Sequence, residues 1–241
     1  MDHQLKQLQD WISESRHIVF FGGAGVSTES GIPDFRSVDG LYHQQYAFPP
    51  ETILSHSFFE RNPEEFYRFY RSKMLFPQAR PNAAHWKLAE LEAAGKLTAV
   101  VTQNIDGLHQ AAGSKTVYEP HGSVHRNHCM KCLRFYGLDF LLETGGVPHC
   151  PACGGVVKPD VVLYEECLDE TTMEGAVEAI AGADMLIIGG TSLAVYPAAG
   201  LIRYYRGNRL ALLTRSATPY DREAGLVINA SHGEVLGAIR V

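Results

Sequence analysis

Two CxxC motifs constrain the fold of this chain more than any other feature of its sequence. Cys129 and Cys132 form the first motif, Cys150 and Cys153 form the second, and 17 residues lie between them. Each motif turns two sulfur atoms to the same side, and a short ribbon can bring the two pairs together around one tetrahedral zinc ion. Four thiolates leave no open coordination position. We therefore expect one zinc ion per chain that organises a small lobe and does not activate water.

Disulfide bonds and a redox-active CxxC motif are the alternatives to a zinc site. The chain has five cysteines, an odd number, and its polar residues 1–10 contain no signal-peptide core. A cytoplasmic location is therefore expected, and it disfavours both alternatives. Cys167 stands apart and is expected to be a partly buried thiol. His128 and His149 flank the motifs, but four cysteines already complete the coordination shell.

The composition is that of a globular protein that binds neither nucleic acid nor membrane. The 241 residues include 27 Asp and Glu against 21 Lys and Arg, which gives a net charge of −6. This balance excludes a basic nucleic-acid coat, and apolar runs such as 18–21 and 185–188 are too short to span a bilayer. With 45% hydrophobic residues, the chain can fill one large domain or two unequal lobes.

Strands alternate with helices along most of the chain. Strands are expected at 17–21, 97–102, 116–119, 161–163, 185–189, 210–213 and 226–228. Helices are expected at 2–13, from 62, at 82–94, at 169–182, from 197 and at the C-terminus. This order is typical of an α/β fold with a Rossmann-like, doubly wound parallel sheet, whose ligand crevice lies at the carboxyl ends of the strands.

Two stretches interrupt the alternation and are expected to form a smaller lobe. Residues 35–80 are rich in aromatic residues and loops, and residues 122–158 contain the two CxxC motifs. The predicted organisation is a Rossmann-like lobe, a helical insertion and a zinc-ribbon insertion. The Rossmann-like lobe comprises residues 1–34, 81–121 and 159–241, and the insertions are residues 35–80 and 122–158.

A glycine-rich loop follows the first expected strand. Gly23-Ala24-Gly25 lets the backbone approach a pyrophosphate and present its N–H groups to it. A hydride-transferring enzyme would continue as G-x-G-x-x-G, with a second strand that ends in an acid. Thr28 stands at the third glycine, however, and Phe48-Pro49-Pro50 occupies the place of that strand. Hydride transfer is therefore disfavoured, while an ordinary glycine turn would not explain the polar run after the loop.

Further motifs follow the loop in a fixed order. They are Gly23-Ala24-Gly25-Val26-Ser27, Gly31-Ile32-Pro33-Asp34-Phe35-Arg36-Ser37, Thr102-Gln103-Asn104-Ile105-Asp106-Gly107-Leu108-His109, His121-Gly122, the paired CxxC motifs, Lys158-Pro159-Asp160-Val161-Val162 and Gly190-Thr191-Ser192-Leu193. This series resembles that of the sirtuins, the NAD-dependent protein-lysine deacylases, over residues 17–230. The resemblance implies that the chain releases nicotinamide from NAD and transfers the acyl group of a lysine to ADP-ribose, forming 2′-O-acyl-ADP-ribose.

The resemblance also implies the roles of individual residues. Gln103 would contact the nicotinamide ribose, Asn104 would orient that ribose or a water, and His121 would be the general base. The implied NAD-binding residues are Gly22, Gly23, Ala24, Gly25, Ser27, Thr28, Ile32, Pro33, Asp34, Phe35, Arg36, Gln103, Asn104, Ile105, Asp106, His121, Gly190, Thr191, Ser192, Thr214 and Arg215. From the residues alone, the polar cluster 103–106 is equally explained by an Asx turn and a helix cap.

The acyl-lysine peptide is expected to lie between the lobes as an extra strand, along residues 162–166 and 193–196. The implied contacts are Val162, Leu163, Tyr164, Leu193, Ala194 and Val195. Sirtuins that prefer acidic acyl groups have an arginine after the Asp-Phe-Arg motif. None occurs here between Arg36 and Arg61, so a neutral acyl chain, acetyl or slightly longer, is predicted.

The chain departs from the sirtuin pattern at two positions. Thr214 stands where most members have an asparagine for the adenosine ribose, and Glu165 stands where many have glycine. The first departure implies a weaker or rearranged ribose contact. The second adds a negative charge, which favours peptides with basic residues beside the acyl-lysine.

Two other functions compete with deacylation. An ADP-ribosyltransferase branch of the family lacks the catalytic histidine, so His121 disfavours it. A zinc-ribbon binding module without catalysis would keep its function in the variants Asn104→Ala and His121→Ala. The expected partners are acyl-lysine peptides, and because no long charged tail is present we expect a monomeric, minimal catalytic core.

Overall fold

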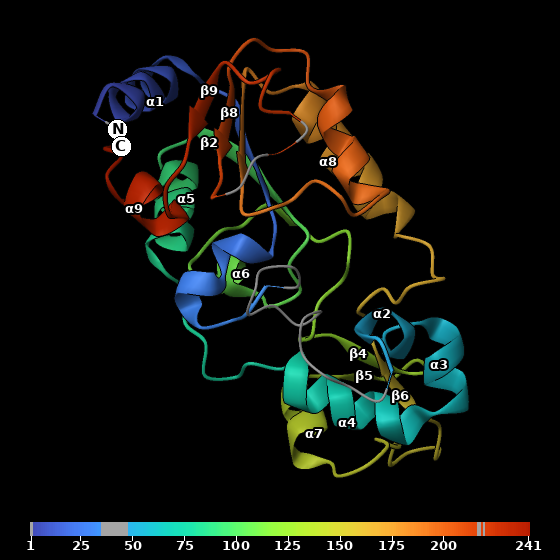
Figure 1. The fold of residues 1–241 in the computed structure, drawn as a ribbon. Coiled ribbons are helices and arrows are strands. Elements are labelled where there is room, and N and C mark those ends of the chain that lie inside the picture. Colours follow the sequence, from blue (N-terminus) through green and yellow to red (C-terminus); the bar gives the residue numbers. More distant parts are fainter. Residues whose placement is uncertain (1, 35–47, 216–217, 219) are drawn as a thin grey trace.

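The computed structural model describes residues 2–34, 48–215, 218 and 220–241, and its larger sheet has six strands (Figure 1). Their order is β3-β2-β1-β7-β8-β9, and every neighbouring pair is parallel. The strands are β1 (Ile18–Gly22), β2 (Leu97–Thr102), β3 (Val117–Tyr118), β7 (Met185–Gly189), β8 (Leu210–Leu213) and β9 (Leu226–Ile228). The predicted Rossmann-like sheet is confirmed. Its strand order reverses between β1 and β7, which is where such sheets bind ligands.

Helices cover both faces of this sheet because successive strand residues point to opposite sides. Ile18 and Phe20 join one core cluster with α1 (Asp2–Glu14), α5 (Ala83–Ala93) and α9 (His232–Gly237). Val19 and Phe21 join another with α8 (Glu170–Ala181) and the 3₁₀-helix η4 (Ala198–Tyr204). Figure 1 shows α1, α5 and α9 on one side of the sheet and α8 on the other.

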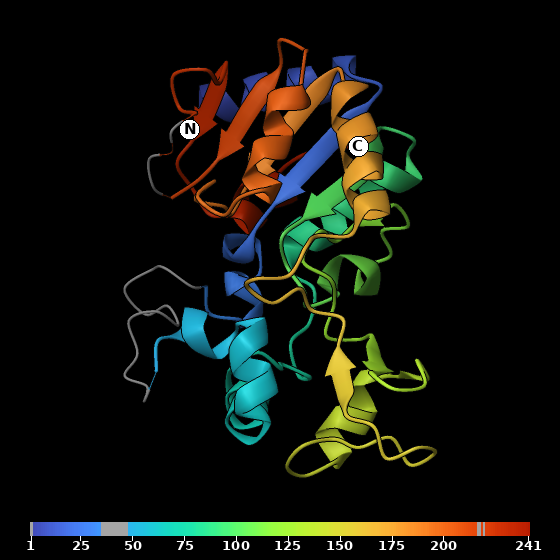
Figure 2. The same ribbon diagram turned by 90° about the vertical axis from the view of Figure 1, so that its right-hand side faces the viewer.

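The remaining elements build a smaller part that lies beyond one end of the sheet (Figure 2). It contains α2 (Pro50–Ile53), α3 (His56–Arg61), α4 (Pro63–Lys73), α7 (Leu138–Glu143) and an antiparallel sheet of β4 (Asn127–Cys129), β5 (Phe135–Tyr136) and β6 (Val157–Pro159). Phe66 and Tyr67 of α4 belong to the same buried cluster as Leu141, Cys129 and Val157. Two segments that are far apart in sequence therefore share one core.

Two local predictions differ from the structure, and several short helices were not predicted. Residues 161–163 are not a strand: β6 lies just before them, and Tyr164 after them forms only an isolated bridge with Ser55. The expected helix from 197 is the 3₁₀-helix η4. The glycine-rich loop continues into two further 3₁₀-helices, η1 (Ala24–Val26) and η2 (Thr28–Ser30), and α6 (Leu108–Ala111) follows β2.

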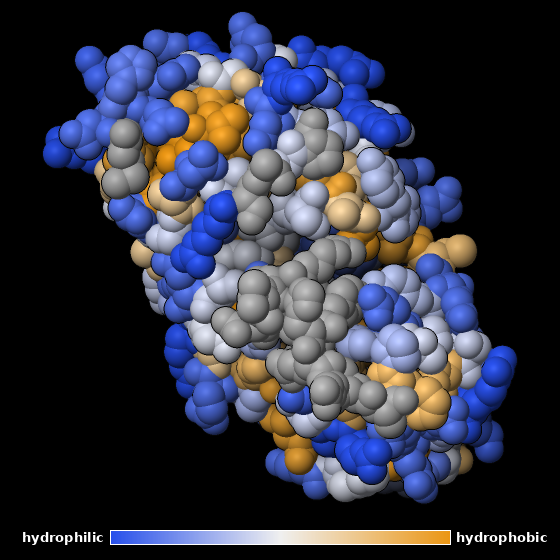
Figure 3. All heavy atoms as spheres, in the orientation of Figure 1, coloured by the Kyte–Doolittle hydropathy of each residue, from blue (hydrophilic) through white to orange (hydrophobic). Residues whose placement is uncertain are grey.

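The surface of the described residues is mixed in polarity. In the view of Figure 3, hydrophilic residues surround separate hydrophobic areas on the upper and lower parts of the molecule. Within the described ranges, no helix combines the length and the hydropathy needed to cross a membrane.

Candidate active site

The carboxyl ends of β1, β2 and β7 open into one cavity of about 1300 Å³. Pockets for one small ligand usually have about 300–1,000 Å³, so this cavity has room for more than one bound group. Most of the residues predicted for the site line it. They are Ala24, Gly25, Ser27, Thr28, Ile32, Pro33, Asp34, Gln103, Asn104, Ile105, Asp106, His121, Val162, Leu163, Tyr164, Gly190, Thr191, Ser192, Val195, Thr214 and Arg215.

The glycines after β1 pack closely against the loop after β7. The amides of Gly23 and Gly25 donate to the carbonyl oxygens of Gly189 and Gly190, at 3.1 and 2.8 Å. A Cβ atom on Gly25 would lie 2.7 Å from Gly190 Cα. These glycines therefore let two loops pack against each other, and their amides do not point to a phosphate. Gly22 and Gly23 are not among the residues that line the cavity, and their contact with NAD stays a prediction.

A chain of polar side chains joins the loop after β1 to the loop after β2. The Ser27 hydroxyl donates to Asp106 Oδ2 at 2.6 Å and accepts from Asn104 Nδ2 at 2.9 Å. Asp106 Oδ1 also accepts from the amide of Leu108 at 2.9 Å. Asp106 thus forms the Asx turn considered from the sequence, and its second oxygen binds the loop after β1. Asn104 is only 8% exposed, so its position at the cavity is well defined.

Gln103 connects β2 to the loop after β7 and leaves one donor unused. Its Oε1 atom accepts from the Thr191 hydroxyl at 2.7 Å, and that hydroxyl accepts from the amide of Leu193 at 3.1 Å. Gln103 Nε2 is buried and has no hydrogen-bond partner among the described residues. A buried donor at a cavity is satisfied when a ligand supplies an acceptor. Gln103 Nε2 is therefore suited to a hydroxyl oxygen of a bound sugar.

His121 is held in the orientation that a general base needs. Its Nδ1 atom lies 3.1 Å from the carbonyl oxygen of Gln103, and since a carbonyl can only accept, Nδ1 carries the proton. Nε2 then keeps a free lone pair. Burial lowers the pKa of His121, so the ring is neutral at physiological pH. The backbone next to His121 is tightly packed. The Val162 amide donates to the His121 carbonyl oxygen at 3.0 Å. At the following residue, Gly122 (φ 75°), a Cβ atom would lie 1.9 Å from Asp160 O.

The four CxxC cysteines converge as predicted. Their Sγ atoms lie within 4.8 Å of one another, with Cys129 and Cys153 at 3.4 Å and Cys132 and Cys150 at 3.7 Å. A tetrahedral zinc site with Zn–S bonds of 2.3 Å separates its sulfurs by about 3.8 Å, so the donor set fits zinc. The Tyr136 hydroxyl lies 2.9 Å from Cys150 Sγ and supports that ligand.

The segment expected to pair with a peptide is already well bonded. Its amides at Val162, Leu163, Tyr164 and Glu166 donate to His121 O, Glu166 Oε2, Leu54 O and Leu163 O, respectively. Only the remaining backbone groups of the segment can pair with another strand. The extra strand therefore stays a prediction, and the structure limits where it can form.

Several predicted residues lie elsewhere than expected. Leu193 is 2% exposed and its side chain packs in the core, and Ala194 is not among the residues that line the cavity, so their contact with the peptide stays a prediction. Cys167 is exposed and not partly buried. Phe35 and Arg36, predicted for the ribose and the diphosphate, lie outside the described residues.

The structure adds one residue that the sequence did not single out. His232, at the start of α9, lines the cavity although it is only 3% exposed. Its Nε2 atom donates to Leu213 O at 3.0 Å, and burial lowers its pKa. A single histidine in a C-terminal helix gives no spacing signal, so only the fold could place it here.

Two buried histidines, His85 of α5 and His109 of α6, lie beside each other with ring centroids 4.7 Å apart. Burial lowers their pKa values to about 4 and about 3. The unfolded chain takes up protons near pH 6.5, whereas the folded chain does not. The free energy of unfolding therefore keeps its full value above pH 6.5 and decreases as the pH falls below it, by about 1.4 kcal/mol per pH unit for each histidine.

The variant His109→Leu is accordingly expected to lose stability less steeply in acid than the unmodified protein. Denaturant unfolding between pH 7 and pH 5 measures the free energy of unfolding, and its slope against pH should be smaller by about one proton. Leu142→Ala, at an exposed leucine of α7, changes no titratable group, so it is the control and should keep the original slope. Equal slopes for all three proteins would contradict this assignment.

Comparison with known proteins agrees with the fold. Residues 23–197 match the model of the Sir2 family. A relative from Clostridium perfringens, described as an NAD-dependent protein deacetylase, is 60% identical over 99% of each chain. A solved structure of Sir2 with a p53 peptide and NAD+ has a TM-score of 0.84 at 41% identity, covering 96% of this chain and 95% of that chain. A Sir2 structure with a deacetylated p53 peptide and 3′-O-acetyl ADP ribose has a TM-score of 0.88 at 39% identity, with the same coverage.

Proposed function

Because the chain belongs to the Sir2 family, we propose that it is an NAD-dependent protein-lysine deacylase that transfers a neutral acyl group from lysine to ADP-ribose. The observation that carries this proposal is the position of His121. Its neutral ring lines the same cavity as Gln103 and Asn104, with Nδ1 tied to the backbone and Nε2 free to take a proton. A binding module would not need such an oriented base at the ends of the strands.

NAD is consumed in this reaction and supplies the ADP-ribose that receives the acyl group. The unused Nε2 of Gln103 binds a hydroxyl of the nicotinamide ribose, and Asn104, fixed by Ser27, orients that ribose or a nearby water. His121 Nε2 then accepts a proton from a ribose hydroxyl and returns it later in the cycle. Thr214 and Arg215 line the cavity at the end of β8, where the adenosine ribose is expected.

The acyl chain is proposed to lie beside Val162 and Tyr164. Both residues line the cavity, together with the apolar side chains of Leu54, Val161 and Leu163. Apolar walls accommodate an acetyl or slightly longer chain, and they offer no partner for a carboxylate at its end. The absence of an arginine between Arg36 and Arg61 in the sequence supports the same substrate class.

The structural zinc ion is proposed to be held by Cys129, Cys132, Cys150 and Cys153. It stays a prediction that the protein is cytoplasmic, is a monomer and binds no nucleic acid. The division into a Rossmann-like lobe with insertions at residues 35–80 and 122–158 also stays a prediction.

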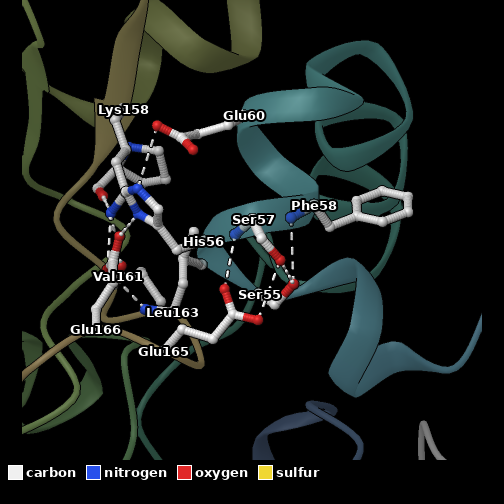
Figure 4. A network of polar contacts seen from close by, with 11 residues as sticks. Ser55, His56, Ser57, Phe58, Glu60, Lys158, Val161, Leu163, Glu165 and Glu166 are labelled. Carbon is white, nitrogen blue, oxygen red and sulfur yellow. Dashed lines mark hydrogen bonds and ion pairs between the residues drawn. The ribbon is translucent and has the colours of Figure 1, made fainter.

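Glu165 adds a negative charge to the rim of the cavity, and Figure 4 shows how it is held there. Its φ of 77° lies in the left-handed region that favours glycine. The Glu165 carboxylate accepts hydrogen bonds from the amide and the hydroxyl of Ser57, at 2.9 and 3.0 Å, which stabilises this conformation. The charge therefore has a fixed position, next to the exposed ring of Tyr164.

The variant Glu165→Gln is expected to lose a preference for basic peptides. For an acetyl-lysine peptide with neighbouring arginines, KM should rise roughly twofold to fivefold, because a rim charge contributes up to about 1 kcal/mol. A neutral peptide should show no change. Glu174→Gln, at an exposed glutamate of α8, is the matched control. An equal KM for the two peptides in the unmodified enzyme would refute the preference.

One experiment tests the proposed function against its alternatives. The pure protein is incubated with NAD and an acetyl-lysine peptide, and the mass of the peptide is then measured by mass spectrometry. Loss of an acetyl group supports deacylation, and a gain of ADP-ribose would instead show a transferase. An unchanged peptide without nicotinamide release would refute both activities.

A further inference from the structure

We propose that Asn82 is a positioning residue that holds the loop of residues 24–30 in the conformation that binds NAD. Asn82 does not line the cavity and was predicted from the sequence only as the beginning of a helix. The proposal rests on the proposed function, because it concerns the NAD site of that reaction. It extends that function by naming what keeps the NAD loop in place.

The side-chain amide of Asn82 has partners on both sides. Nδ2 donates to the carbonyl oxygen of Val26 at 2.8 Å and to the Ser30 hydroxyl at 3.0 Å. Oδ1 accepts from the amide of Ala84 at 3.0 Å and caps the N-terminus of α5. Among short side chains, only an amide offers two donors and an acceptor at once. Aspartate would keep the helix cap and lose the bond to the Val26 carbonyl, whereas the Ser30 hydroxyl can still donate to a carboxylate.

The loop needs such support because its own structure is weak. η1 and η2 have three residues each, and the hydrogen-bond geometry of 3₁₀-helices is poorer than that of α-helices. Val26 and Ser30, the two partners of Asn82, lie on either side of Ser27. Ser27 in turn binds both Asn104 and Asp106. Movement of the loop would therefore disturb the polar chain at the cavity.

Helix α5 is a rigid anchor for this contact. Its residues Ala84, Leu88 and Leu91 are fully buried in the core against the large sheet. The His85 ring also accepts a hydrogen bond, at 3.3 Å, from the backbone amide of Asn82, which completes a capping box. The side chain of Asn82 thus holds the NAD loop in a fixed position relative to α5.

The variant Asn82→Asp separates positioning from helix stability. We expect KM for NAD to rise roughly tenfold, because the hydrogen bond to Val26 is lost and a carboxylate then faces the Val26 carbonyl oxygen. The kcat value and KM for the peptide should stay within about twofold, and the thermal midpoint should change little because the cap is kept. Calorimetry with NAD alone should show the same loss of affinity.

Two further variants make the result decisive. Asn82→Ala removes the cap as well, so it should raise KM for NAD and also lower the thermal midpoint. Asp169→Ala removes the cap of α8, where Asp169 Oδ1 accepts from the Thr172 amide at 2.8 Å, and should lower the midpoint without changing KM for NAD. The proposal is overturned if Asn82→Asp binds NAD as the unmodified protein does. Failure of the proposed function is distinct, since the unmodified protein would then show no deacylation.

Discussion

Replacing His121 with alanine is expected to lower kcat for deacylation by about 10²- to 10⁴-fold, the usual contribution of a general base. The loss should occur with little change in fold, because the main-chain bond from Val162 to His121 O does not involve the imidazole. KM for NAD should change less than kcat, since the ring acts on a proton during the reaction. Steady-state rates with an acetyl-lysine peptide measure both constants.

The pH profile gives a second signature of the same residue. Because burial lowers the pKa of His121, the base stays unprotonated below pH 6.5 and loses activity only as the pH falls through its lowered pKa. The acidic limb of kcat/KM should therefore lie below pH 6.5 and should disappear in His121→Ala. His17→Ala is the control and should keep both rate and profile. Unchanged kcat in His121→Ala would remove His121 from the reaction.

Replacing Cys150 with serine is expected to abolish zinc binding and unfold the smaller part of the molecule. Structural zinc contributes about 10–16 kcal/mol to folding in zinc-finger peptides, which is as large as the whole stability of about 5–15 kcal/mol of a typical domain. The strands of the small sheet are only two or three residues long, so they cannot form a stable sheet alone. Cys129, Leu141 and Val157 also complete the core around α4, which would be exposed.

Elemental analysis and hydrogen exchange test this expectation together. Cys150→Ser should contain no zinc and lose amide protection over residues 122–158, while the amides of β1 and β7 keep theirs. Cys167→Ser is the matched control, because Cys167 is exposed and lies outside the cluster, so its zinc content should stay at one per chain. A zinc-free protein with full protection over residues 122–158 would contradict the structural role of the metal.

The large sheet was predictable because its strands are continuous apolar runs that end at glycine or polar residues. The bounds predicted for β2, β7, β8 and β9 agree with the structure. The run at 161–163 was equally apolar, yet it crosses between the two parts of the molecule and pairs with no strand. Local pattern cannot distinguish these cases, because strand pairing depends on the distant partner.

The site was predictable where its residues follow strands directly, as Gln103 and Asn104 do after β2. The positions of Asn82 and His232 could not be read in the same way, since their contacts lie 52 or more residues away or depend on the final helix. The glycines were predicted to let the backbone approach a nucleotide, and in the structure their close approach is to Gly190. Which backbone a glycine faces is a property of the folded molecule.

The stoichiometry of the reaction tests the central claim most directly, namely that one cavity couples NAD cleavage to acyl removal. Nicotinamide, deacylated peptide and O-acyl-ADP-ribose are quantified together by chromatography and mass spectrometry after incubation with NAD and an acetyl-lysine peptide. We expect the three products in equal amounts, and none of them without NAD. Free acetate formed while NAD remains intact would contradict the coupling and the proposed function with it.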